Sequence, residues 1–370
     1  MGLVFDDNLP ENEIFEVSLI GTGGGYGESI VIHLGNQEWI VVDSCIDPYT
    51  KKCLPLEYLI SKKVDVSKNV KMIICTHWHD DHIRGISELF ESCESSAFCM
   101  ASVSDRKKFL SFVGLDYNKI EKDASTASTI EITKCLEIVK LRNLQIKAAA
   151  QDRLLLKLSF AKIYSLSPSD FVINEFNNEI STLITEYGAS NRKVIIQTPN
   201  EKSVALYITV NNYGVLLGSD LEVSTNKNKG WICILDNCQC FETRASLFKI
   251  PHHGSINGYH PRIWNELLNK NAVAQLTPWN QAGKVLPCKD MLECYLNHTD
   301  ELYSTSSNAL SNTAKKREKS IAKAIKNFNS SVSEVKYKLG IIRCQLNFLE
   351  RNAKWNTDLF GEAIKILQVN

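Results

Sequence analysis

Four side chains that commonly bind metal ions follow one apolar run. Val70 to Cys75 predicts a buried strand, and His77, His79, Asp81 and His82 come directly after it. Imidazole nitrogens and carboxylate oxygens are the ligands that zinc and manganese accept in proteins. In a loop that leaves a strand, this spacing directs the first two imidazoles at one metal ion. The last two groups then face a second ion, about 3.5–4 Å away.

A second group of candidate ligands lies late in the chain. His252 and His253 follow a strand predicted over 247–250. Two neighbouring ions need a shared anionic ligand, and Asp220 is the best candidate because it ends a strand predicted over 215–220. Five of the eight histidines lie in these two loops. Gathering imidazoles and carboxylates without a cation is costly, so a metal centre explains the clustering better than surface histidines do.

Short β-branched runs separated by glycine or asparagine turns predict most of the strands. Helical spacing of apolar residues predicts three helices before residue 200. The first strands are expected over 15–20, 29–34 and 39–43, with a glycine-rich turn over 21–28. Later strands are expected over 154–158, 161–166 and 203–210, and the helices over 54–62, 83–91 and 170–186.

The chain is expected to form one domain over residues 1–305, of which 101–199 is the hardest part to interpret. Residues 306–370 are predicted to be an extension, because the composition there changes to Ser, Asn and Lys. A basic helix over 315–328 opens this extension, and a strand (337–348) and a helix (355–367) are predicted to close the fold. A basic helix face is usually a solvated surface, although it can also bind nucleic acid or a protein partner.

Composition limits the classes of protein to which the chain can belong. The 42 Lys and Arg residues balance 42 Asp and Glu, so no global basic field attracts nucleic acid or an anionic membrane. The acidic start lacks the pattern of a secretory signal, and no apolar run approaches the about 20 residues of a membrane helix. Most of the 12 cysteines stand singly. We therefore expect reduced thiols, a cytoplasmic location and no membrane partner.

The cluster His77-Trp78-His79-Asp80-Asp81-His82 resembles the H-x-H-x-D-H signature of the metallo-β-lactamase superfamily. The resemblance implies an α/β fold, an αββα sandwich with the site at the edge where two sheets meet. It also implies that Asp43 hydrogen-bonds within the site without binding metal. Asp220 matches the acid that bridges the two ions, and Pro251 to Ser255 matches the late histidine motif.

A finer resemblance, over about residues 14–305, is to the domain of the ComEC competence protein and to phosphorylcholine esterases. Gly25 to Ser29 is similar to their G-x-G-D-S turn, which makes Glu28 a site-supporting residue. Leu166 to Asp170 is similar to their L-x-P-x stretch, and Asn200 with Ser203 to their N-x-x-S. His-His-Gly-Ser is fairly specific to this branch.

The sequence departs from many superfamily members in one respect. They have a third histidine on the first metal, whereas here no histidine occurs from Ile83 through Pro251. The resemblance then leaves water to complete the first metal, and it turns His252 toward the substrate. It assigns His77, His79 and Asp220 to the first metal, and Asp81, His82, Asp220 and His253 to the second.

These assignments predict a metal-dependent hydrolase with two divalent ions, Zn²⁺ or Mn²⁺, and a water between them. Asp81 and His252 are the predicted catalytic residues: Asp81 orients the water, and His252 stabilises charge or protonates the leaving oxygen. The leading hypothesis is a phosphodiesterase or nuclease, since the ComEC-like relatives are thought to be nucleases. Two alternatives are a hydrolase of lactones, thioesters or other small esters, and a non-catalytic metal-binding protein that binds a partner through its C-terminal extension.

Overall fold

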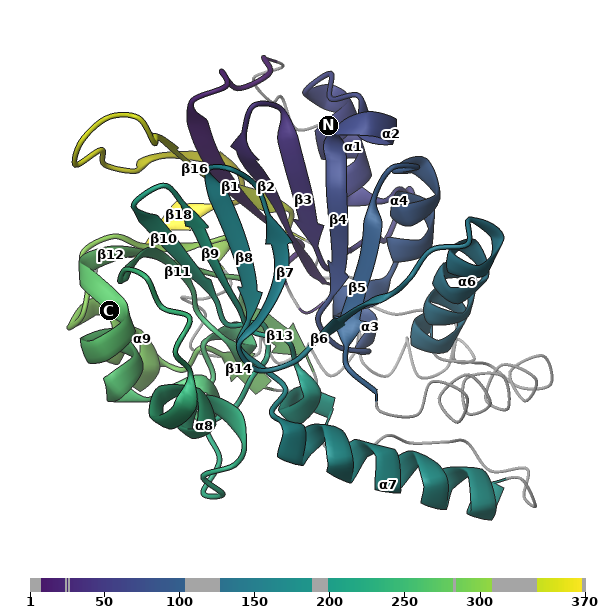
Figure 1. The fold of residues 1–370 in the computed structure, drawn as a ribbon. Helices are drawn as coiled ribbons and strands as arrows, with labels where there is room; N and C mark the ends of the chain where they lie inside the picture. Colours follow the sequence, from purple (N-terminus) through teal and green to yellow (C-terminus); the bar gives the residue numbers. More distant parts are fainter. Residues whose placement is uncertain are drawn as a thin grey trace, which may run out of the picture.

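Two large β-sheets face each other, and helices cover their outer faces (Figure 1). The computed structural model describes residues 8–23, 25, 27–103, 127–187, 199–281, 284–307 and 338–367. The arrangement is an α/β sandwich of four layers, as predicted.

The first sheet has the strand order β17-β16-β1-β2-β3-β4-β5-β6. Strands β3 to β6 run parallel to one another, whereas β1, β2, β16 and β17 pair antiparallel with their neighbours. The strands are β1 (Ile14–Gly21), β2 (Glu28–Gly35), β3 (Glu38–Val42), β4 (Val70–Cys75), β5 (Ala97–Ala101), β6 (Lys147–Ala149), β16 (Gly340–Asn347) and β17 (Asn356–Gly361).

The second sheet has the order β18-β15-β12-β11-β10-β9-β8-β7. Here β10, β11, β12 and β15 are parallel, and the strands at both edges are antiparallel. The strands are β7 (Arg153–Lys157), β8 (Ala161–Ser165), β9 (Leu206–Val210), β10 (Tyr213–Leu217), β11 (Ala245–Lys249), β12 (Leu268–Leu276), β15 (Leu302–Ser304) and β18 (Ile364–Lys365). A small hairpin is formed by β13 (Trp279–Gln281) and β14 (Lys284–Leu286).

Helices pack against the outer face of each sheet. Those on the first sheet are α1 (Leu54–Ser61), α2 (Val66–Asn69), α3 (Asp80–Ile83), α4 (Ile86–Ser92) and α6 (Ala127–Leu141). The second sheet is covered by α8 (Gly230–Asn237) and α9 (Lys289–Leu296). Helix α7 (Asp170–Tyr187) lies along the lower edge of the sandwich in Figure 1 and packs Phe176 and Ile180 into the apolar cluster of the first sheet. Short helical turns are η1 (Pro199–Lys202), η2 (His252–Gly254), η3 (Ile256–Gly258) and η4 (Ile263–Leu267). None of the helices in the described ranges is both long and apolar enough to cross a bilayer.

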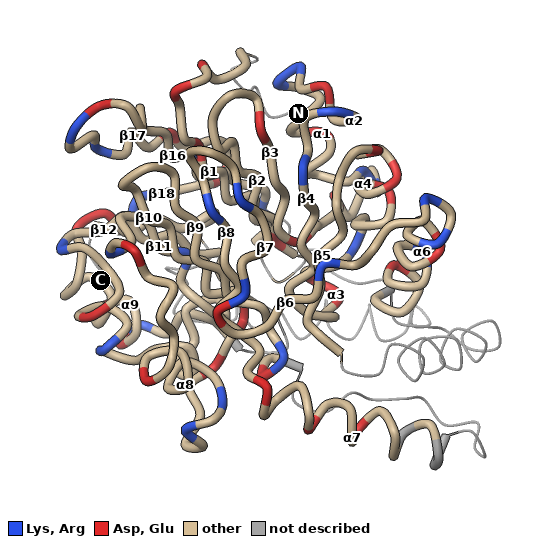
Figure 2. Tube along the Cα trace, in the orientation of Figure 1, with Lys and Arg blue, Asp and Glu red and all other residues tan. Residues whose placement is uncertain are grey.

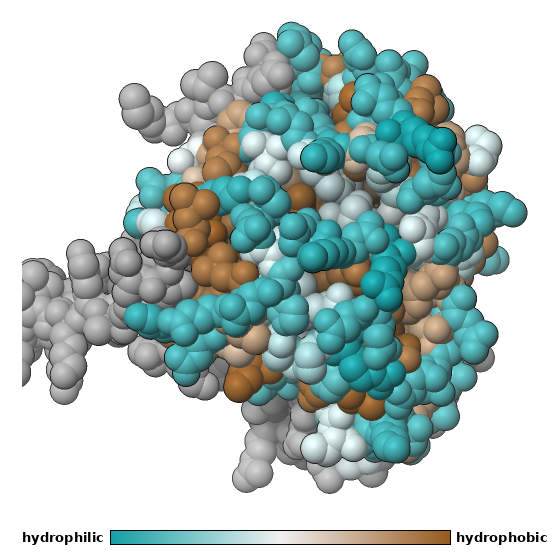
Figure 3. Space-filling model, turned by 90° about the vertical axis from the view of Figure 1, so that its left-hand side faces the viewer, coloured by the Kyte–Doolittle hydropathy of each residue, from teal (hydrophilic) through white to brown (hydrophobic). Residues whose placement is uncertain are grey.

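Three apolar clusters hold these layers together. One lies between the sheets and joins side chains such as Val17 and Ile32 to Leu206 and Leu217 of the opposite sheet. The other two fill the space between each sheet and its helices. Figure 2 shows Lys and Arg mixed with Asp and Glu over most elements but only acidic residues along α7, and the face in Figure 3 is largely hydrophilic with separate apolar patches. Apolar packing thus connects the neighbouring layers of the sandwich.

The last part of the chain differs from the prediction. The helix predicted over 355–367 is wrong: β17 pairs with β16, and β18 pairs with β15. Trp355 packs on Phe15 at a ring distance of 5.4 Å, so this segment is held by strand pairing and by distant partners. β16 itself lies between β17 and β1 within the first sheet. The basic helix predicted over 315–328 lies outside the described residues.

Two helices also differ from the prediction. The helix expected over 83–91 is divided into α3 and α4 at Gly85, whose φ is +81°. Helix α6 was not predicted at all, although Ile132, Cys135 and Val139 are buried at helical spacing. The predicted helices over 54–62 and 170–186 are confirmed as α1 and α7.

Candidate metal centre

The candidate ligands lie where the two sheets meet, at the carboxyl ends of two pairs of parallel strands. Asp43 follows β3 and His77 follows β4, and these strands are parallel neighbours. In the second sheet, Asp220 follows β10 and His253 follows β11, again a parallel pair. Carboxyl ends of parallel strands share one edge, so each sheet supplies two adjacent loops. The backbone N–H of Val204 donates to the Thr76 carbonyl at 3.1 Å and links the two edges.

The first ligand set consists of His77, His79 and Asp220, whose donor atoms lie within 4.8 Å of one another. His77 Nε2 lies 3.2 Å from His79 Nδ1 and 3.9 Å from Asp220 Oδ2. His77 and Asp220 are buried, and His79 is half-buried. The structure therefore brings together the three side chains that the resemblance assigned to the first metal.

The second set consists of Asp81, His82 and His253, also within 4.8 Å. Asp81 Oδ2 lies 3.3 Å from His253 Nε2 and 3.8 Å from His82 Nε2. Asp220 reaches this set as well, because its Oδ1 is 3.4 Å from His82 Nε2 and its Oδ2 is 3.8 Å from His253 Nε2. One carboxylate thus contacts both ligand sets.

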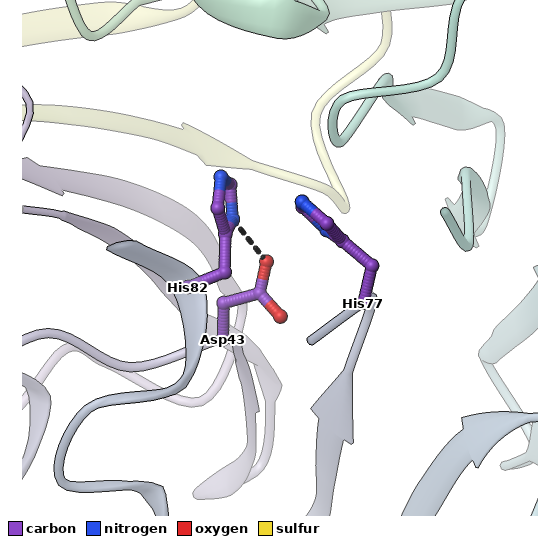
Figure 4. Close-up of side chains that lie close together, drawn as sticks. All are labelled: Asp43, His77 and His82. Atoms are coloured by element: carbon purple, nitrogen blue, oxygen red, sulfur yellow. Dashed lines mark hydrogen bonds and ion pairs between the residues drawn. The ribbon is translucent and has the colours of Figure 1, made fainter. Parts of the chain in front are cut away.

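Asp43 orients the His82 ring by binding Nδ1, the ring nitrogen that faces away from the centre. Its Oδ2 lies 2.8 Å from His82 Nδ1 (Figure 4), and it accepts hydrogen bonds from the Thr76 N–H and hydroxyl at 2.7 Å each. His253 Nδ1 is fixed in the same way, 3.0 Å from the Thr277 carbonyl. With Nδ1 engaged in both rings, Nε2 is the nitrogen that faces the centre. Asp43 thus holds the position that the resemblance implied.

The ligands carry perturbed pKa values because they are buried together. Burial holds the pKa of His77 well below its usual range, so this imidazole is neutral. Burial also opposes charge on His82 and His253, but the Asp220 and Asp81 carboxylates outweigh it and raise both pKa values. Conversely, these imidazoles overcome the effect of burial on the two carboxyls and lower the pKa values of Asp81 and Asp220.

The side chains fit a pair of divalent ions. His82 Nε2 and Asp220 Oδ1 are both buried and have no hydrogen-bond partner among the described residues. Such atoms are costly unless a cation or proton satisfies them. Nitrogen and carboxylate oxygen donors in sets of three to four match zinc and similar ions. His77, His79 and Asp220 could therefore hold one ion, and Asp81, His82 and His253 could hold another with Asp220 in reach of both.

A buried ion pair lies next to the candidate metal centre. Lys249 Nζ pairs with Glu28 Oε1, and both side chains are almost fully buried. Glu28 also lies 4.0 Å from His82 Nδ1, and the Lys249 ammonium is 3.4 Å from the Ser219 carbonyl. Burial disfavours charge on Lys249, yet Glu28 and then Asp220 raise its pKa, so the ammonium is retained. A small cavity of about 10 Å³ is lined by both residues of this pair. Lys249 was missed by sequence reasoning, although a lysine inside an apolar strand was a detectable signal.

His252 lies beside the centre but has partners of its own. Its Nδ1 is 3.1 Å from Glu222 Oε1, and its Nε2 is 3.3 Å from Asn200 Nδ2. The His252 side chain holds the pKa of the Glu222 carboxyl below its usual range. His252 is thus separate from the two ligand sets. Glu222 was not predicted, since the contact with His252 joins residues far apart in the chain.

Comparisons with known proteins give remote likenesses. Among solved structures, YhfI from Bacillus subtilis, a metallo-beta-lactamase fold protein, has 14% identity over 64% of this chain and 70% of its own, with a TM-score of 0.34. The metallo-beta-lactamase SMB-1 bound to 2-mercaptoethanesulfonate has 15% identity, 60% and 70% coverage and a TM-score of 0.29. FIM-1 from Pseudomonas aeruginosa, in its mono-zinc form, has 11% identity, 61% and 72% coverage and a TM-score of 0.29.

Sequence comparison is informative for the first part of the chain. No curated protein matches. Residues 22–100 match the family model of the metallo-beta-lactamase superfamily. This stretch includes Asp43 and all four candidate ligands of the first cluster. The similarity to the superfamily model is thus confined to the part of the chain that holds this first cluster.

Proposed function

We propose that the protein is a metal-dependent hydrolase that cleaves phosphodiesters. The observation that carries the proposal is the position of Asp220, which lies within 4 Å of His77 in one ligand set and of His82 and His253 in the other. Two ions that share one carboxylate can hold both the attacking and the leaving oxygen of a displacement at phosphorus. Most members of the superfamily are metal-dependent hydrolases, which agrees with this reading.

Each group of residues in the site has a separate role in such a reaction. When bound, two divalent ions would act as Lewis acids and favour ionisation of a water near neutral pH. His77, His79 and Asp220 form a set of three protein ligands, which leaves a place for a phosphate oxygen. Asp81 stands between His82 and His253 and orients the attacking water. His252, outside both sets, faces the substrate and protonates the leaving oxygen.

One observation favours small substrates over a long polyanion. Among the described residues, three lysines lie in or pair with the segments that carry Asn200 and His252, and acids already neutralise all three. Lys229 pairs with Glu175 at 2.7 Å and with Glu201 at 3.1 Å, and Lys202 pairs with Glu179 at 2.9 Å. The third, Lys249, is buried against Glu28. Nucleic acid binding depends on free Lys and Arg that neutralise phosphates. We therefore keep hydrolysis of lactones, thioesters or other small esters as the second candidate.

A substrate panel separates these candidates. The Mn²⁺- or Zn²⁺-loaded protein is assayed on a chromogenic phosphodiester, on DNA and RNA, and on a carboxylic ester and a lactone. We expect cleavage of the phosphodiester, its loss in Asp220→Asn, and full activity in the control His298→Gln, which lies away from the site against Trp264. Hydrolysis of the ester or lactone alone would overturn the proposal. A steep fall of affinity with salt identifies a polyanionic substrate.

A further inference from the structure

Two loops each supply one side chain to the ligand sets and one to the rim beside them. In the loop after β10, Asp220 contacts the ligand histidines and Glu222 lies on the rim. In the loop after β11, His253 contacts the ligands and His252 lies on the rim. Glu222 and His252, here called the rim pair, therefore make the same kind of contact as the ligand pair Asp220 and His253, but closer to the protein surface. Asn200, from the turn η1, joins the rim pair from a third segment.

The backbone holds the two loops in register. The His252 N–H donates to the Ser219 carbonyl at 2.9 Å, and the Val223 N–H donates to the Asn257 carbonyl at 2.7 Å. His252 and His253 have φ values of +49° and +54°. Residues with a side chain rarely adopt this backbone conformation, so the hydrogen bonds around the loop must enforce it. The separation of Glu222 and His252 is thus set by a rigid frame.

The contacts around His252 fix which ring nitrogen carries hydrogen. Asn200 Nδ2 lies 3.0 Å from Glu222 Oε1 and 3.3 Å from His252 Nε2. The amide has two hydrogens, so it can donate to both atoms, and the neutral ring then has its hydrogen on Nδ1. Nδ1 lies 3.1 Å from Glu222 Oε1 but makes no hydrogen bond with any described residue in this conformation. Such contacts often straighten only when substrate binds.

We propose that Glu222 is the positioning residue of His252, holding its ring so that Nε2 addresses the leaving oxygen. The inference rests on the proposed function and adds to it. In the reaction, a water oxygen forms the new P–O bond and releases a proton. The P–O bond to the leaving group breaks, and its electron pair stays on the leaving oxygen. His252 first takes up a proton from the solvent at Nε2, in place of the contact with Asn200, and passes it to that oxygen while the Nδ1 hydrogen remains toward Glu222. The proton released by the water passes to the solvent, so the ring ends neutral as it began.

The test compares two substrates of equal shape whose leaving groups differ in basicity. Methyl p-nitrophenyl phosphate expels a stable anion that needs little protonation, whereas methyl phenyl phosphate expels a phenolate with a pKa of about 10, as in tyrosine. For Glu222→Ala in the metal-loaded full chain, we expect kcat on the phenyl ester to fall by about 10–100-fold. We expect kcat on the nitrophenyl ester to change by less than about 3-fold and KM on both esters to stay unchanged.

Two further variants test whether the loss of activity in Glu222→Ala comes from the lost contact with His252 or from a general disturbance of the fold. Glu222→Gln keeps a carbonyl oxygen in place of the carboxylate, so it should recover most of the lost kcat on the phenyl ester. Glu201→Gln, which removes an acid that pairs with Lys229 at 3.1 Å, should match the wild type. Equal losses on both esters, or no loss on either, would overturn the role of Glu222.

A spectroscopic measurement separates failure of this role from failure of the proposed function. If the wild type cleaves neither ester, the phosphodiesterase proposal fails, and Glu222 is then judged by ¹⁵N NMR of His252. Hydrogen on Nδ1 in the wild type and a mixture of tautomers in Glu222→Ala would support positioning. The same tautomer in both proteins would overturn it.

Discussion

His82 is held between two carboxylates, with Nδ1 2.8 Å from Asp43 Oδ2 and Nε2 3.4 Å from Asp220 Oδ1. Asp43 follows a strand of the first sheet, and Asp220 follows a strand of the second. One imidazole thus connects the two halves of the sandwich at the candidate metal centre. Its orientation depends on Asp43, and its pKa depends first on burial and then on Asp220 and Asp81.

Asp43→Asn should weaken metal binding without removing a metal ligand. The amide cannot reproduce the charged contact with His82 while it also accepts from the Thr76 N–H and hydroxyl. Loss of such an outer partner typically costs about 10–100-fold in metal affinity. Isothermal titration with Zn²⁺ measures the change. Asp236→Asn, which breaks a surface ion pair with Arg262, is the matched control. Equal affinities for Asp43→Asn and the wild type would contradict the orienting role.

Metal binding should release protons from His82 and His253. Without an ion, both pKa values are raised above the ordinary value of 6.5 by neighbouring carboxylates that outweigh burial. Ligation requires neutral imidazoles, so affinity falls as pH is lowered through these raised values. Titrations at one pH in two buffers of different ionisation enthalpy count the protons released. Release of none at pH 7 would contradict the raised pKa values, since His77 is already neutral.

The metal-free protein should lose stability as the pH is raised. His82 and His253 have higher pKa values when folded than when unfolded, so their contribution is full below about 6.5 and disappears as pH rises through the folded values. Asp81 and Asp220 act in the opposite sense, because their lowered pKa values stabilise the fold above the ordinary carboxyl range. Urea unfolding of metal-free protein from pH 6 to 9 checks the first effect. Stability that rises steadily over this range would contradict it.

Lys249→Met should destabilise the protein by about 3–5 kcal/mol, because it leaves the Glu28 carboxylate buried and unpaired. The double variant Glu28→Gln with Lys249→Met should recover part of this loss, since neither charge then remains. Chemical denaturation measures both. Lys162→Met removes an exposed pair with Glu242 and should change nothing measurable. A single Lys249 variant as stable as the wild type would show that the pair is not needed.

The sequence was most informative where the signal is local. The apolar run of β4 and the ligand spacing after it lie within the 13 residues from Val70 to His82, so strand and cluster could be predicted together. The segment 355–367 was predicted as a helix because the pairing of β18 with β15 and the contact of Trp355 with Phe15 join residues far apart. The contacts Glu28–Lys249 and Glu222–His252 were missed for the same reason. Helix α6 was missed because its Lys, Ser and Thr residues obscured a short apolar stripe.

Anomalous diffraction from crystals grown with Zn²⁺ tests the central claim most directly. We expect two peaks, one beside His77 and His79 and the other beside Asp81, His82 and His253. Asp220 should contact both, as its distances to the two ligand sets require. A single peak, or two peaks of which Asp220 contacts only one, would contradict the shared carboxylate on which the proposed mechanism depends.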